Sequence, residues 1–191
     1  MALSLGAEFA TRAAAGYPRG FRSLTMISPT GFRARGTSVA SQRAYLPVKR
    51  FNVYNALAFA LWGRPLFDLI TTRRSIEWFL QRSFEGIVPQ EMVEYAYISA
   101  HQPGAEHAPL HFIAGDLFTP DMAVQFYEPL DVPALVIYDR DSYTQFDMLP
   151  GVLHRNPNIR AVKVAPTLGL PHFERPDAMF AALDEFWQSV G

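Results

Sequence analysis

Apolar residues recur at helix-like and strand-like spacings along the chain, and the order of these patterns predicts an α/β fold. Residues 5–15 carry apolar side chains at helical spacing, and Tyr17-Pro18-Arg19-Gly20 ends this pattern. The short β-prone runs that predict strands lie at 24–27, 134–138 and 159–164. Helical patterns near 148–154 and from Pro176 onward alternate with the strands. This order predicts a short parallel sheet of about three strands with flanking helices.

Residues 31–118 have a different pattern. The first part, 31–48, is loop-like, with glycine, serine and arginine and little periodicity. Amphipathic helical stripes follow, with their apolar positions at Val53, Ala56, Leu57, Ala60 and Leu61; at Ile76, Phe79, Leu80 and Phe84; and at Met92, Val93, Tyr95, Ala96 and Ile98. We interpret this region as a helical insertion that divides a core formed by 1–30 and 119–191.

Composition narrows the classes of function. The 191 residues carry a net charge of -1 without a basic or acidic block, which argues against nucleic acids and anionic membrane surfaces as partners. The absence of cysteine excludes disulfides and thiolate chemistry. No apolar run reaches the roughly 18 residues of a membrane span. Glu8 interrupts the only segment that resembles a targeting peptide, so we expect a cytoplasmic location.

The most informative stretch is Ala2-Leu3-Ser4-Leu5-Gly6. It has the form small-x-Ser-x-Gly, which is typical of a sharp strand-to-helix turn that exposes a nucleophilic hydroxyl. The helical pattern that follows is the one that this motif requires. A serine hydroxyl needs a neighbouring base before it can attack an acyl carbonyl, so Ser4 is a candidate nucleophile whose partners must come from elsewhere.

On four segments in order, the chain resembles the C-terminal part of an α/β-hydrolase. The segments are the Ser4 motif with its helix, the strand Leu24-Thr25-Met26-Ile27, the acid strand Leu135-Val136-Ile137-Tyr138-Asp139-Arg140-Asp141, and the histidine loop Leu170-Pro171-His172-Phe173-Glu174. The resemblance implies a partial α/β-hydrolase fold in which 31–118 is a helical cap. It also implies hydrolysis of carboxylic esters or related small acyl compounds, without a cofactor or metal.

The resemblance assigns roles to particular residues. Ser4 would be the nucleophile, Asp141 the acid that orients the base, and His172 the base, while the N–H of Leu5 would be one donor of the oxyanion hole. Asp139 is a rival for the acid. In the family, a Gly-His pair usually precedes the Leu-Pro-His-Phe-Glu segment, and here Gly169 stands at the position of that histidine. His172 would therefore have taken over the role of base, or it is a structural histidine and the triad is broken.

The comparison with the family also indicates missing strands. The family builds more than half of its sheet before the serine motif, and so this chain is a fragment, or its start codon is assigned too late, or its fold is rebuilt. A bare strand edge would be a template for association, including a homo-oligomer. The alternative function is therefore a non-catalytic hydrolase-derived fragment that folds by association.

A metal site is the weakest chemical hypothesis for this sequence. His107 and His111 are spaced i,i+4 with Glu106 beside them, but Pro109 between them argues against a shared helix face. No third ligand is evident, so no metal is expected.

Overall fold

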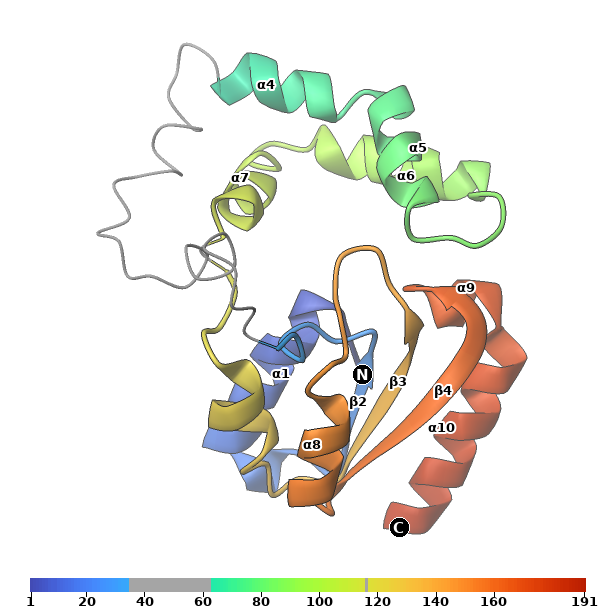
Figure 1. Ribbon diagram of the computed structural model, residues 1–191. Helices are drawn as coiled ribbons and strands as arrows, with labels where there is room; N and C mark the ends of the chain where they lie inside the picture. The colour runs from blue at the N-terminus through green and yellow to red at the C-terminus, as the bar shows by residue number, and fades with distance from the viewer. Residues whose placement is uncertain (35–62, 116) are drawn as a thin grey trace. The chain divides into compact units, whose positions relative to one another are not determined.

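The computed structural model describes residues 1–34, 63–115 and 117–191, which divide into two compact units. The first unit consists of residues 1–34, 83–85 and 119–191, and it contains the sheet (Figure 1). Within the described ranges, the second unit contributes 63–82, 86–115 and 117–118. Both ends of the insertion therefore connect to the sheet unit, and a three-residue segment from inside it, 83–85, also belongs to that unit.

The first unit has a parallel four-stranded sheet with the order β1-β2-β3-β4. The strands are β1 (Ala2–Leu3), β2 (Leu24–Ile27), β3 (Ala134–Arg140) and β4 (Ile159–Leu168). The predicted α/β fold class and parallel sheet are confirmed, and β4 lies at an edge. The expected count of about three strands misses β1, which is only two residues long and pairs Ala2 with Met26 and Leu3 with Ile27.

Helices cover both faces of the sheet (Figure 1). In this unit the helical segments are α1 (Leu5–Gly16), η1 (Pro18–Gly20), η2 (Ala123–Tyr127), α8 (Leu149–Arg155), α9 (Pro171–Glu174) and α10 (Pro176–Val190). One buried cluster joins α1, η2 and α8 to the side chains of Met26 and Val136. A second cluster joins α10 to Leu135 and Ile137. Successive β3 residues therefore contribute to opposite faces, as the two-residue period of a strand requires.

Burial explains why the central strands form where the sequence predicts them. All four residues of β2 are buried, and β3 is buried from Ala134 through Ile137. Near-continuous apolar runs of this kind are typical of parallel strands that are covered on both faces. β4 has one neighbour in the sheet, and more of its residues are exposed.

The pairing of β3 with β4 becomes irregular near its carboxyl end. The register is regular from Ala134 paired with Ile159 to Tyr138 paired with Lys163, and it then shifts so that Arg140 pairs with Leu168. The strand predicted at 159–164 is therefore too short at its carboxyl end, because β4 continues through Leu168. The backbone N–H of Thr167 donates to Oδ2 of Asp139 at 2.9 Å, a side-chain bond that holds this extension against β3.

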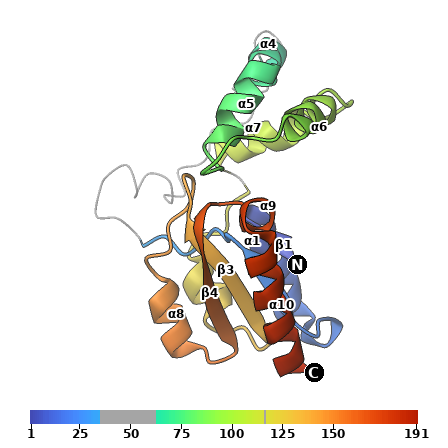
Figure 2. The same cartoon turned by 90° about the vertical axis from the view of Figure 1, so that its right-hand side faces the viewer.

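The second unit contains the helices α4 (Gly63–Ile70), α5 (Arg73–Gln81), α6 (Gln90–Ala100) and α7 (His107–Ala114) (Figure 2). The helical patterns at 76–80 and 92–98 correspond to α5 and α6, although Phe84 lies beyond the end of α5. The predicted stripe at 53–61 lies outside the described residues. None of the helices in the described ranges is both long enough and apolar enough to cross a membrane.

Candidate active site

Ser4 occupies the junction between β1 and α1 with an unusual backbone conformation. Its φ is 49° and its ψ is -123°, a combination that residues with a Cβ rarely adopt. The N–H of Ser4 donates to the carbonyl oxygen of Ile27 at 2.8 Å, and its own carbonyl oxygen accepts from the N–H of Ala7 at 3.0 Å. The chain therefore turns from strand to helix within one residue, as the sequence motif predicts.

The structure explains the small residue of the motif at position 2 but not the glycine at position 6. Ala2 packs against the core cluster under α1, so a small side chain suits this position. A Cβ added to Gly6 would meet no described atom within 4 Å, so crowding by the described residues does not explain that glycine. Leu5 is the first residue of α1, and the first N–H groups of a helix have no partner within the helix. This is the property that the proposed oxyanion donor needs.

The two acidic residues at the end of β3 have different environments. Asp139 is buried, and its carboxylate accepts the N–H of Thr167 and lies 3.4 Å from Nζ of Lys163. Asp141 lies beyond the strand, where Oδ1 accepts the N–H groups of Tyr143 at 2.7 Å and Thr144 at 3.2 Å. Both interactions of the Asp139 carboxylate are therefore with residues of β4. Oδ2 of Asp141, in contrast, has no hydrogen bond to any residue in the described ranges.

Partial burial shapes the ionisation of Asp141. It raises the pKa of Asp141 above its ordinary value, and the two backbone N–H groups partly oppose this increase. A carboxylate that is partly removed from water interacts more strongly with a nearby cation than an exposed one does. Asp141 is therefore suited to stabilising an imidazolium, which is the role that the resemblance to α/β-hydrolases implies for it.

His172 lies in the short helix α9, which follows β4, and not in the predicted loop. Its ring contacts the Phe173 ring, with 4.5 Å between the ring centroids. Burial lowers the pKa of His172 below its ordinary value, which favours the neutral imidazole that a general base requires. Nδ1 is buried and has no hydrogen-bond partner among the described residues.

Gly169 is the residue that approaches Asp141. Its φ is +103°, and a Cβ built on it would lie 2.9 Å from Oδ2 of Asp141. A side chain at this position would therefore both strain the backbone and collide with the carboxylate. The backbone at the position where the resemblance implies a histidine is thus packed directly against the candidate acid.

The candidate residues follow the carboxyl ends of three strands: Ser4 follows β1, Asp141 follows β3, and His172 follows β4. Because the strands are parallel, these three ends lie along the same edge of the sheet. The structure brings the side chains to one edge without joining them: in the described part of the chain, no hydrogen bond links Ser4, Asp141 and His172.

Glu174 lies two residues after His172, and the sequence alone predicts no role for it. Its Oε2 accepts the N–H of Leu168 at 2.8 Å, and its Oε1 accepts the N–H of Glu85 at 2.6 Å. Glu85 in turn forms an exposed ion pair with Arg140, at the end of β3. Glu174 thereby closes the turn that carries His172 and fastens it to the segment 83–85. Its place two residues after His172 was visible in the sequence, but its partner at position 85 was not.

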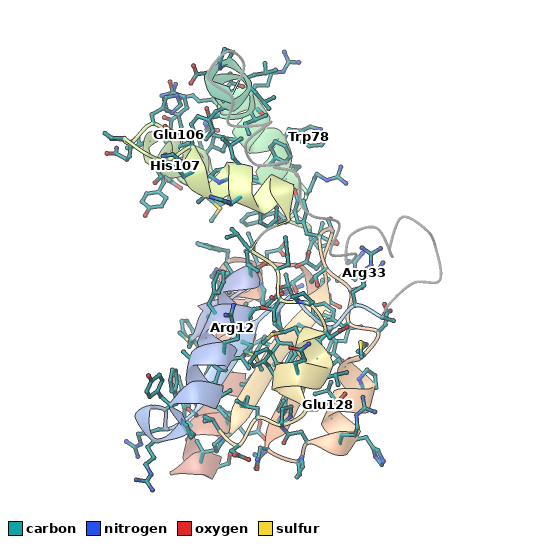
Figure 3. The ribbon with its side chains drawn as sticks, turned by 90° about the vertical axis from the view of Figure 1, so that its left-hand side faces the viewer. Arg12, Arg33, Trp78, Glu106, His107 and Glu128 are labelled. Carbon is teal, nitrogen blue, oxygen red and sulfur yellow. The ribbon has the colours of Figure 1, made fainter. Side chains whose placement is uncertain are left out.

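The pair His107 and His111 bears on the hypothesis of a metal site. His107, labelled in Figure 3, and His111 both lie in α7, so the objection based on Pro109 is wrong. Pro109 is the third residue of this helix, and a residue in the first turn does not need its N–H for an intrahelical bond. Even so, the described residues contain no group of three histidine, aspartate or glutamate side chains that could hold a metal ion.

Comparisons with known proteins give no match by sequence. No family model matches the chain, and no curated protein matches it. Solved structures do match, and three similar ones are bacterial enzymes. The chain is 14% identical to a meta-cleavage product hydrolase from Pseudomonas fluorescens, with a TM-score of 0.68, covering 100% of this chain and 64% of that one.

The second structure is a bacterial membrane phospholipase A, which is 18% identical with a TM-score of 0.67; the match covers 98% of this chain and 56% of that one. The third is 2-hydroxy-6-oxo-6-phenylhexa-2,4-dienoate hydrolase from a Rhodococcus strain, 16% identical with a TM-score of 0.66, covering 97% of this chain and 62% of that one. The chain thus spans less than two thirds of the length of these proteins. Its described residues have the α/β-hydrolase fold over the part of that fold that the chain covers.

Proposed function

We propose that this chain is a serine hydrolase that acts on carboxylic esters or related small acyl compounds. The observation that carries the proposal is the conformation of Ser4, with φ 49° and ψ -123° between a parallel strand and a helix. Holding a serine in a sparsely populated region of backbone space costs about 1–3 kcal/mol, and such strain clusters at active sites. A serine with only a structural role at this turn could be replaced by glycine at no cost in strain.

The reaction follows from the chemistry of the three side chains. His172 accepts the hydroxyl proton of Ser4 as the serine oxygen attacks the acyl carbonyl, and the N–H of Leu5 donates to the oxygen that becomes negative. The tetrahedral intermediate expels the alcohol, which takes the proton from His172, and an acyl-Ser4 ester remains. Water then gives a proton to His172 as its oxygen attacks the acyl carbon. The carboxylic acid leaves when the bond to the serine oxygen breaks, and that oxygen takes the proton back from His172, which restores Ser4.

Asp141 has a supporting role in this scheme. Its negative charge would stabilise the positive charge that His172 carries in each transition state, and its position would select the productive tautomer. This requires His172 and Asp141 to approach each other, because no hydrogen bond joins them in the described part of the chain. Catalytic hydrogen bonds are often long in the free enzyme and tighten when substrate binds. In this proposal the helices of the second unit correspond to the cap of an α/β-hydrolase.

A second candidate is a non-catalytic protein that keeps the hydrolase fold and folds by association. Two observations favour it: Nδ1 of His172 has no hydrogen-bond partner in the described ranges, and Leu3 on the edge strand β1 is 39% exposed. An unpaired strand edge with an exposed apolar residue is a template for pairing with another chain. This candidate predicts no turnover and a concentration-dependent oligomer.

The deciding experiment measures hydrolysis of a chromogenic short-chain ester by the wild-type protein, Ser4→Ala and Ser28→Ala. Ser28 is the matched control, because it also follows a strand of the sheet and also has a positive φ, of 41°. Loss of hydrolysis in Ser4→Ala with retention in Ser28→Ala supports the proposal. Equal hydrolysis by the wild type and Ser4→Ala would overturn it. Covalent labelling of Ser4 by a fluorophosphonate, read by peptide mass spectrometry, identifies the nucleophile directly.

A further inference from the structure

Glu8 is a buried carboxylate for which the proposed chemistry has no use. It lies on α1, one turn after Ser4, and only 1% of it is exposed. Burying a carboxylate is costly unless hydrogen bonds or charges replace the lost water. Its place in the first turn of α1 supplies part of that compensation, because the positive end of the helix dipole favours a negative charge.

Hydrogen bonds from two distant parts of the chain supply the rest. The hydroxyl of Thr30 donates to Oε1 of Glu8, and the backbone N–H of Thr119 donates to Oε2 at 2.7 Å. Thr30 belongs to the loop after β2, and Thr119 is where the chain returns to the first unit after the insertion. The two oxygens of the Glu8 carboxylate therefore bind two different segments of the chain to α1.

One of these segments touches Ser4. The N–H of Thr30 lies 3.5 Å from the carbonyl oxygen of Ser4, which also accepts the N–H of Ala7. The carbonyl oxygen of Thr30 accepts the hydroxyl of the buried Tyr127 at 2.8 Å. Burial, and to a lesser extent the charge of Glu8, raises the pKa of Tyr127 well above its ordinary value, so this hydroxyl stays protonated as a donor. Thr30 is thus held on both sides while its N–H faces Ser4.

We infer that Glu8 is a positioning residue for the nucleophile: it holds Thr30 against the carbonyl of Ser4 and so maintains the strained backbone that presents the serine hydroxyl. The catalytic consequence of this inference rests on the proposed function, whereas the structural consequence does not. A strained backbone conformation of this kind persists only when several surrounding contacts hold it in place. The Glu8–Thr30 bond is a suitable restraint because it joins the helix after Ser4 to the loop beside it.

The first test measures kcat and KM for ester hydrolysis by Glu8→Ala, Glu8→Gln and Thr11→Val. We expect Glu8→Ala to lower kcat by about 100-fold, as small displacements of reacting groups can, with KM unchanged. Glu8→Gln should recover most of kcat, because its amide oxygen can accept from Thr119 while its NH₂ group donates to the Thr30 hydroxyl. Unaltered kcat in Glu8→Ala, or equal losses in Glu8→Ala and Glu8→Gln, would overturn the inference.

Thr11→Val is the matched control on the same helix. Thr11 is fully buried, and its hydroxyl bonds to the carbonyl oxygen of Ala7 and not to the Ser4 loop. It should lose stability but keep kcat. If Thr11→Val loses as much kcat as Glu8→Ala, the effect belongs to the general stability of α1 and the inference fails.

The second test does not depend on activity. Hydrogen exchange at the Thr30 and Ser4 amides is compared between the wild type and Thr30→Val, which removes the donor to Glu8 while keeping the shape of the side chain. Faster exchange at these two amides, after correction for global stability, supports the inference; unchanged exchange overturns it. A wild-type protein without esterase activity but with this exchange response would refute the proposed function and leave the role of Glu8 in place.

Discussion

The carboxylate of Asp141 lies against the backbone of Gly169, so closely that a Cβ on Gly169 would be 2.9 Å from Oδ2. Asp141 and Gly169, which are 28 positions apart in the chain, therefore pack so closely that position 169 has no room for a side chain. This contact lies in the turn between β4 and α9, the turn that leads to His172. A substitution at Gly169 therefore tests whether activity depends on the position of the Asp141 carboxylate.

Gly169→Ala should reduce both stability and activity. The methyl group would meet the carboxylate, and the φ of +103° is unfavourable for alanine. We expect a loss of about 1–3 kcal/mol in the free energy of unfolding, measured by urea denaturation. Ester hydrolysis should fall as well, because Asp141 would be displaced.

Gly115→Ala is the control for Gly169→Ala. Its φ is +76°, but a Cβ there would meet no described atom within 4 Å. This variant should lose stability through backbone strain alone and keep its activity. Equal activity losses in the two variants would show that the contact between Gly169 and Asp141 has no special role.

Ser4→Gly should stabilise the protein while removing its activity. Glycine adopts positive φ without steric cost, so the strain of about 1–3 kcal/mol at Ser4 would be relieved, less roughly 0.5–1 kcal/mol for the extra freedom of glycine in the unfolded chain. Ser4→Ala keeps the Cβ and should gain nothing. Thermal and urea unfolding of both variants provide the measurement, and a Ser4→Gly protein less stable than Ser4→Ala would contradict a strained turn.

The two acids after Tyr138 should separate stability from catalysis. Asp139→Ala leaves the buried N–H of Thr167 without its acceptor, so we expect a loss of about 1–3 kcal/mol in unfolding free energy. Asp141→Ala should instead lower kcat by roughly 10³–10⁴-fold with a smaller change in stability. The measurements are urea unfolding and steady-state kinetics. The reverse pattern would make Asp139 the catalytic acid.

His172 should set the acidic limb of the activity profile. A general base acts when it is neutral, and burial lowers the pKa of His172, so activity should persist below the ordinary imidazole pKa of about 6.5 and fall only as pH drops through the lowered value. The measurement is kcat/KM against pH. An acidic limb centred above the ordinary imidazole pKa would be inconsistent with His172 as the base.

The same shift predicts how stability depends on pH. The folded protein binds the His172 proton more weakly than the unfolded chain does, so stability is unaffected above the unfolded pKa and falls as pH drops below it. His172→Gln should flatten this part of the curve. Urea midpoints between roughly pH 5 and 7 check the prediction, because that range brackets the ordinary histidine pKa.

Local patterns predicted much of the sheet. The runs at 24–27 and 134–138 are buried strands because covered parallel strands require nearly continuous apolar residues. β1 was missed because two residues carry no periodicity, and its assignment depends on pairing with β2. The end of β4 was missed because it depends on the Asp139 carboxylate, a contact between residues that are far apart in the sequence.

The candidate site could be read from the sequence only in part. A serine with a small residue two positions before it and a glycine two positions after it, ahead of a helical pattern, predicted the turn at Ser4, since that conformation is set by neighbours along the chain. The division of labour between Asp139 and Asp141 could not be read, because it depends on the register with β4. The hydrogen bonds of Glu8 and Glu174 could not be predicted either, because their partners Thr119 and Glu85 are distant in sequence.

The irregular pairing between Tyr138 and Arg140 has a consequence for protein engineering. An irregular step in a strand changes the direction of the side chains that follow it. The number of residues at this point, and not only their identity, therefore decides which of the two acids accepts the N–H of Thr167. Deleting Arg140 would place the Asp141 carboxylate directly after Asp139 and so change its surroundings, while leaving the composition almost intact. Libraries that vary length at this position would therefore explore function more widely than libraries that vary only side chains.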